Sequence, residues 1–228
     1  MLSKRASFVG ALALAVAAWA APASAAELNF DQLIDGGTLS YGGNLGDPLV
    51  GTAIRFDTIS DGSATLECRG CTLSFSTGGS TFESASFNTY GSGGTFVLTG
   101  SAYSGADLDP TTADGSLEAS GTLLTGTFTG DQFLIDGGAQ LTFNGFGIDS
   151  KNQDLLDYFG ITDTNFVFAN TDISATTGAN IRNAFNVNVA EADITNTSVA
   201  PEPASLLLFG TVMLGGARAF RRRRLAQA

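Results

Sequence analysis

The middle of the chain, residues 26–198, predicts an all-β fold: a single β-sandwich or jelly-roll-like domain with one short helix. Two observations carry this prediction. Apolar and polar residues alternate over short segments, which is the period of half-buried strands. Pairs of glycines separate these segments, and short strands between such turns favour a sandwich or a partly closed barrel. About 170 residues are enough for one sizeable core.

Composition favours a folded middle over a disordered one. Gly, Ser and Thr supply 65 of the 172 residues in 27–198, a share that flexible segments also show. Leu, Ile, Val and Phe supply 44, about a quarter. That exceeds the roughly 20% below which highly charged chains stay unfolded.

The alternation predicts the individual strands, and the glycine pairs predict the turns between them. The strands are expected at 72–76, 82–87, 95–99, 141–144, 166–168 and 185–189. The turns are expected at Gly36-Gly37, Gly42-Gly43, Gly78-Gly79, Gly93-Gly94 and Gly137-Gly138.

One segment has a helical pattern instead. Ser150 and Gln153 fit a capping box, with Ser150 as the N-cap residue. Leu155 and Leu156 then begin an apolar face, and Gly160 suits the position after the last turn. The pattern predicts a short helix over 151–159 that covers one end of the sheets.

Residues 1–25 have the form of a cleaved signal peptide. Lys4 and Arg5 precede an uncharged apolar run of 14 residues, Phe8–Ala21. Ala23 and Ala25 then supply the small-x-small cleavage pattern. The alternative is an N-terminal anchor or buried helix, but a membrane span needs about 20 residues. Export would place the body in an oxidising compartment.

Residues 199–228 form a second terminal signal. Pro201-Glu202-Pro203 precedes a predicted membrane helix at 204–220, and a basic stop follows at 218–224. Its uncharged part, 204–217, reaches only about 21 Å, short of a bilayer core of about 30 Å. Positive residues stay cytoplasmic, so the body is expected outside. The arginines of the basic stop are Arg218, Arg221, Arg222, Arg223 and Arg224.

The order of tripeptide, apolar helix and terminal arginines resembles the PEP-CTERM sorting tail. The resemblance covers residues 199–224 and implies a substrate of an exosortase, a membrane-embedded transpeptidase-like protease. It implies an inner-membrane intermediate, cleavage near Pro201-Glu202-Pro203 and delivery to the surface of a Gram-negative bacterium. It also implies an association with exopolysaccharide and biofilm matrix. The alternative is a tail anchor that is never cut.

Charge and residue content exclude several function classes for the body. Residues 27–198 hold 4 basic and 21 acidic residues, and the chain has no histidine. Ser-His-Asp and Cys-His catalysis and histidine metal sites are therefore excluded. An acidic body also argues against nucleic acid as a partner. We expect no catalytic residues and no cofactor.

The two cysteines, Cys68 and Cys71, are the most specific local feature of the body. The flanking residues suggest strands joined by a two-residue hairpin turn at Arg69-Gly70. Facing residues across such a turn lie within disulfide reach. We therefore expect a structural disulfide. Free thiols and a redox pair are the alternatives, and a redox pair needs a helix N-terminus.

The acidic loop 104–118 offers a partial calcium pattern. Asp107, Asp109 and Glu118 match positions 1, 3 and 12 of an EF-hand loop. Thr112 stands where the sharp turn requires glycine. A solvated acidic surface is thus favoured over a Ca²⁺ site.

The sequence therefore predicts a non-enzymatic exported protein of the cell surface or extracellular matrix. The alternative is a secreted carbohydrate-binding module or a glycan-acting hydrolase. Against it, the body has no tryptophan and only four tyrosines, which leaves few of the usual platforms for stacking on sugars.

Overall fold

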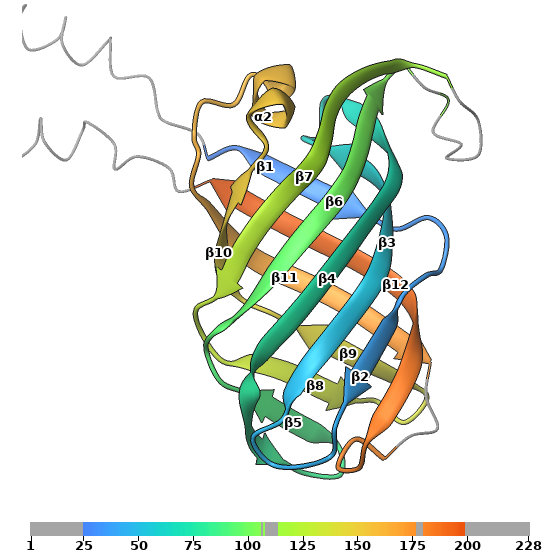
Figure 1. Ribbon diagram of the computed structural model, residues 1–228, viewed down its shortest axis with the longest axis vertical. Coiled ribbons are helices and arrows are strands. Elements are labelled where there is room, and N and C mark those ends of the chain that lie inside the picture. Colours follow the sequence, from blue (N-terminus) through green and yellow to red (C-terminus); the bar gives the residue numbers. More distant parts are fainter. Residues whose placement is uncertain (1–24, 106, 108–113, 177–179, 199–228) are drawn as a thin grey trace, which may run out of the picture. The chain divides into compact units, whose positions relative to one another are not determined.

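The computed structural model describes residues 25–105, 107, 114–176 and 180–198 (Figure 1). Twelve strands and one helix lie in these ranges. The strands of the first half are β1 Glu27–Asp31, β2 Thr38–Tyr41, β3 Pro48–Ser60, β4 Thr65–Glu83, β5 Phe87–Tyr90 and β6 Gly94–Ser104. The second half contributes β7 Ser116–Phe128, β8 Gln132–Asp136, β9 Gln140–Asn144, β10 Gly147–Lys151, α2 Gln153–Phe159, β11 Phe166–Thr176 and β12 Phe185–Ser198.

The strands form one antiparallel sheet that closes on itself. The ring runs β3, β4, β6, β7, β10, β11, β12, β2 and back to β3. At one end β5, β8 and β9 make a second bridge from β4 to β11, and β1 lies between β12 and β3. In Figure 1, β7, β6, β4 and β3 make a front layer, with β1, β12, β11 and β9 crossing behind it. The predicted all-β, sandwich-like class with one short helix is confirmed.

Alternate residues of each strand point between the layers and form the core. Aromatic rings from distant strands meet there: the centroids of Phe96 and Phe168 are 4.3 Å apart, and those of Phe75 and Phe143 are 4.9 Å apart. Burial of this apolar surface provides the main driving force for folding. It also fixes the outward positions, on which candidate sites must lie.

One strand prediction and one turn prediction are wrong. The segment 82–87 is not one strand, because β4 ends at Glu83 and Ser84 donates its N–H to the Phe87 carbonyl in a turn (2.9 Å). Gly78-Gly79 is not a turn, because both residues lie inside β4. A Cβ atom on either would come within 2.4 Å of a carbonyl oxygen of a neighbouring loop. These glycines therefore allow close backbone approach rather than a reversal.

The helix is present but begins later than predicted. Ser150 is not its N-cap, because Ser150 and Lys151 belong to β10 and pair with β7. Asn152 caps α2 instead, and its side-chain oxygen accepts the N–H of Asp154 at 2.9 Å. Gly160 ends the helix in the left-handed conformation, as predicted.

Apart from Ala25, which is exposed, both terminal signals lie outside the described residues, and so does Asp109. This covers the signal peptide with Ala23, the Pro201-Glu202-Pro203 tripeptide, the membrane helix 204–220 and the arginines of the basic stop. Within the described ranges, the helix present is too short to cross a bilayer.

Candidate functional site

The cysteine pair lies in a bulge of β4 rather than at a hairpin turn. On β3, Phe56 faces Cys71 and Thr58 faces Glu67, so the one residue between them on β3, Asp57, opposes three residues of β4. The hairpin prediction is wrong because β3 and β6 flank β4 on both sides, and the chain continues between them. Gly70 absorbs the bulge with φ +60°.

The sulfur atoms of Cys68 and Cys71 are at disulfide-bonding distance, with their Cα atoms 5.6 Å apart. Both residues are buried in the core. Gly100 on the neighbouring β6 makes room for them, because a Cβ atom there would lie 2.4 Å from the Cys71 sulfur. A buried pair in a strand lacks the exposed, electropositive setting of a redox-active pair.

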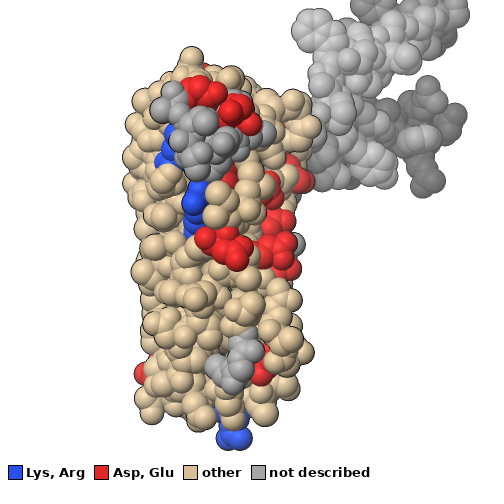
Figure 2. All heavy atoms as spheres, turned by 90° about the vertical axis from the view of Figure 1, so that its right-hand side faces the viewer, with Lys and Arg blue, Asp and Glu red and all other residues tan. Residues whose placement is uncertain are grey.

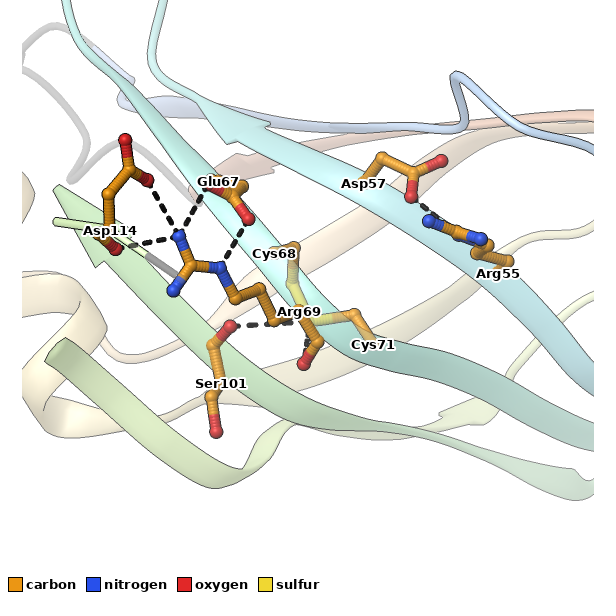
Figure 3. A network of polar contacts seen from close by, with 8 residues as sticks. All are labelled: Arg55, Asp57, Glu67, Cys68, Arg69, Cys71, Ser101 and Asp114. Atoms are coloured by element: carbon orange, nitrogen blue, oxygen red, sulfur yellow. Dashed lines mark hydrogen bonds and ion pairs between the residues drawn. A yellow bond between two sulfur atoms is a disulfide. The ribbon is translucent and has the colours of Figure 1, made fainter. Parts of the chain in front are cut away.

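Arg69, within the same bulge, is the centre of a polar network (Figure 3). Its Nη2 group donates to the Glu67 carboxylate at 2.9 Å and to the Asp114 carboxylate at 2.9 Å. Its guanidinium also lies over the Tyr103 ring, 4.2 Å from the centroid. The hydrogen bond to Glu67 is the main cause of a raised pKa for Arg69.

The network brings three carboxylates together. Oxygens of Glu67, Asp107 and Asp114 all lie within 4.8 Å of one another. Carboxylate oxygens suit Ca²⁺, but the Arg69 cation already neutralises part of this charge. The Glu67 side chain is fully buried, whereas that of Asp114 is 45% exposed. The carboxylates of Glu67 and Asp114 therefore hold the Arg69 guanidinium as their counter-ion.

Of the two predicted calcium ligands that the structure describes, Asp107 lies with other carboxylates and Glu118 does not. Asp107 joins Glu67 and Asp114, two residues that the sequence pattern did not select. Glu118 lies outside this described group, and its carboxylate accepts a hydrogen bond from the Ser104 hydroxyl. Asp109 is among the residues that are not described. Sequence spacing failed here because Glu67 is on β4, far from the loop along the chain.

A second buried ion pair faces the interior at β10. Lys151 Nζ lies 2.8 Å from Asp149 Oδ1, and both side chains are fully buried. The ammonium group lies 4.0 Å from the Phe166 ring centroid, while Asp149 Oδ2 has no hydrogen-bond partner. Burial lowers the pKa of Lys151 to about 8 and raises the pKa of Asp149. Sequence reasoning assigned Lys151 to a helix and missed this pair.

The described body has two surface hollows with acidic lining residues. One of about 330 Å³ is lined by Asp149 together with Thr125, Thr127, Ile148 and Asn165, among others. The other, of about 360 Å³, has Asp35 as its acidic lining residue. Each contains one carboxylate, whereas glycoside hydrolysis requires a pair about 5 to 10 Å apart across the sugar.

Comparison with known proteins bears on the end of the chain. A family model of the PEP-CTERM protein-sorting motif matches residues 199–224. The chain carries this motif. The match starts directly after β12, includes Pro201-Glu202-Pro203 and ends at Arg224, as the resemblance implied. No curated protein and no solved structure matches the chain. The PEP-CTERM motif supports an exported protein that an exosortase sorts through the membrane toward the cell surface.

We predict that Cys68 and Cys71 are bonded in the exported protein and that the bond stabilises it modestly. A four-residue loop limits the stabilisation to about 2 kcal/mol on the chain-entropy estimate. The double substitution of both cysteines by serine should lower the free energy of unfolding by about that amount in urea titrations. Non-reduced peptide mass spectrometry that finds two free thiols would contradict the bond.

Substitution Arg69→Gln should destabilise the body, because it leaves the buried Glu67 carboxylate without its cation. Removing one partner of an ion pair at a buried carboxylate is destabilising, and the partial exposure of Arg69 reduces this effect without removing it, so the urea midpoint should fall clearly. Urea unfolding measures this. Arg182→Gln, at an exposed arginine, is the matched control and should change stability by less than about 0.5 kcal/mol. An equal effect of both would refute the counter-ion role.

The Lys151–Asp149 pair should make stability rise with pH between about 8 and 9.5. The folded pKa of Lys151, about 8, is below the unfolded value of 10.5, so the unfolded chain binds more protons in this window. This contribution is complete above the unfolded pKa and is lost as pH falls through the folded pKa. The pH range stops there because burial raises the pKa of Tyr90. At higher pH this tyrosine ionises in the unfolded chain first, which lowers stability as pH rises. Urea unfolding of the double variant Asp149→Leu, Lys151→Met should lack this rise.

Proposed function

We propose that this chain is a surface or extracellular-matrix protein of a Gram-negative bacterium, sorted by an exosortase, whose body acts by binding rather than by catalysis. The PEP-CTERM motif at residues 199–224 is the observation that carries the sorting part of this proposal. The exosortase is the first partner, and the inner membrane is a transient one. Exopolysaccharide is the proposed partner of the delivered body.

The arrangement of the chain ends supports excision of an intact body. Ala26 and Ser198 are adjacent: the Ala26 N–H donates to Ser198 Oγ at 2.8 Å, and the Ser198 N–H donates to the Ala26 carbonyl at 2.7 Å. Strands β1 and β12 pair directly beside them. Cleavage after Ala25 and near Pro201-Glu202-Pro203 would therefore remove both terminal signals without removing any strand of the described sheet.

The surface of the body supports a binding role. Its closed sheet presents outward side chains on a rigid frame, and its charge of −17 over residues 27–198 sets its electrostatic preference. The described hollows do not bring two carboxylates together at a sugar-sized cleft. These features favour adhesion or matrix binding over glycan hydrolysis.

Replacing Pro201-Glu202-Pro203 by three alanines should block processing and leave full-length protein in the inner membrane. The physical reason is that the processing enzyme recognises the tripeptide, while the N-terminal signal still drives export. Fractionation and intact-mass measurement of the surface protein test this directly. Deleting Leu225–Ala228, which lies outside the matched motif, is the matched control and should leave processing unchanged. A mature surface protein that still ends at Ala228 would contradict the sorting proposal.

A further inference from the structure

Four phenylalanines form a row on the outer surface at one end of the body. We call Phe82, Phe87, Phe133 and Phe146 the phenylalanine row. Successive ring centroids are 6.3, 5.6 and 6.3 Å apart, and the rings of Phe87 and Phe133 are stacked. Phe82 is 54% exposed and Phe146 is 40% exposed. Phe87 and Phe133, between them, are half-buried, so all four rings reach the surface.

This surface is not required by the core. On β5 and β8 the inward positions are filled by Asn88, Tyr90, Gln132 and Leu134, all fully buried. The outward positions nevertheless carry Phe87 opposite Ile135, and Ile135 is 44% exposed. A solvated sheet face normally carries polar side chains at these positions. Contiguous exposed apolar residues of this kind mark an interaction site.

The charges around the phenylalanine row are acidic. Residues 79–91 and 131–146, which contain the row, include Glu83, Asp131 and Asp136 and no Lys or Arg. Beyond the row on the same outer face, three adjacent strands place carboxylates side by side. We call Asp172, Asp193 and Asp31 the carboxylate row.

The strand pairings place the phenylalanine row and the carboxylate row on one line across the outer face of the sheet. Phe133 faces Asn144, Asn144 faces Asp172, Asp172 faces Asp193, and Asp193 faces Asp31, as the strand pairings give in sequence. Burial and the neighbouring charges of Asp31, Asp172 and Glu191 raise the pKa of Asp193. Figure 2 shows acidic side chains at the top, in the middle and along one edge of the face drawn, with Lys and Arg side chains beside the middle group. A cation bound there would relieve this mutual repulsion.

These features together select the chemistry of a ligand. An extended peptide would dock by adding a strand to a sheet edge, but the strands that carry the two rows already have neighbours on both sides. A pyranose ring can lay its C–H face on an aromatic ring and needs no edge. Adjacent carboxylates complement positive charge on the same polymer. The phenylalanines thus supply stacking surfaces that the absence of tryptophan from the body appeared to exclude.

We propose that the phenylalanine row and the carboxylate row together bind a polysaccharide that carries free amino groups. The aromatic rings stack on the sugar faces, and the carboxylates pair with the ammonium groups. This inference deepens the proposed function and rests on it for the body's access to extracellular polymers. Binding is measured on the purified exported protein, so it can fail while sorting succeeds, and the reverse.

Isothermal titration of the exported protein with a glucosamine hexamer tests the proposal, with the N-acetylglucosamine hexamer as the uncharged probe. We expect binding of the glucosamine hexamer, at least about tenfold weaker binding of the acetylated one, and loss of affinity between about 0.05 M and about 0.5 M salt. The double variant Phe87→Thr, Phe133→Thr should bind about tenfold more weakly, because it removes two stacking rings.

Two further variants separate stacking from charge. Asp172→Asn with Asp193→Asn should remove most of the preference for the charged hexamer. Leu117→Thr, at an exposed apolar position on β7 outside the row, is the matched control and should bind like the wild type. Thermal unfolding of each variant verifies that it is folded.

Four results would overturn the proposal. One is no binding of the glucosamine hexamer, and another is equal binding by the wild type and the phenylalanine variant. Equal affinity for both hexamers would identify a neutral glycan surface instead. Sedimentation should show the same oligomeric state with and without the phenylalanine substitutions. A dimer that the substitutions dissolve would show that the row is an interface between copies of this chain.

Discussion

Closure of the sheet is the constraint on which the rest of this structure depends. Each described strand has a hydrogen-bonded neighbour on both sides over at least part of its length, so closure leaves few unpaired backbone groups. The first half of β7, Ser116–Thr122, pairs with β6 alone. Closure requires β4 to run 19 residues and to pair with β3, β5 and β6. The bulge at Cys68–Cys71 lets such a long strand change direction while it stays paired.

Most of the few Lys and Arg side chains of the body pair with buried carboxylates. Three of the four basic residues in 27–198 each pair with an acidic residue two positions away on the same strand: Arg55 with Asp57, Arg69 with Glu67 and Lys151 with Asp149. Residues two apart in a strand share a face, so each cation neutralises a carboxylate that the core would otherwise destabilise. Asp57 also accepts the N–H groups of Leu33 and Ile34. The remaining carboxylates leave the surface acidic.

The two parts of the proposed function use separate parts of the chain. Sorting depends on a terminal motif that starts directly after the last strand. Binding depends on outward side chains of a body whose first and last described strands pair with each other. The described ends of the body, Ala26 and Ser198, lie side by side, whereas the phenylalanine row lies on β4, β5 and β8 and on the connection after β9. In such a protein, substitutions on the outward face can change the ligand without altering the sorting motif.

The sequence by itself determined the sorting motif, the all-β class, most glycine turns and the end of the helix at Gly160, because each depends on residues that are neighbours along the chain. The spacing of an acidic and a basic residue two apart was also present in the sequence and would have indicated that the two charges share a face of a strand. Only the tertiary structure decided that the chain passes straight through Cys68–Cys71 and that Asp107 meets Glu67. It also decided that Phe87 and Phe133 point outward. Each of these outcomes depends on which distant strands lie side by side, and the alternation within one strand does not reveal which of its faces will be buried.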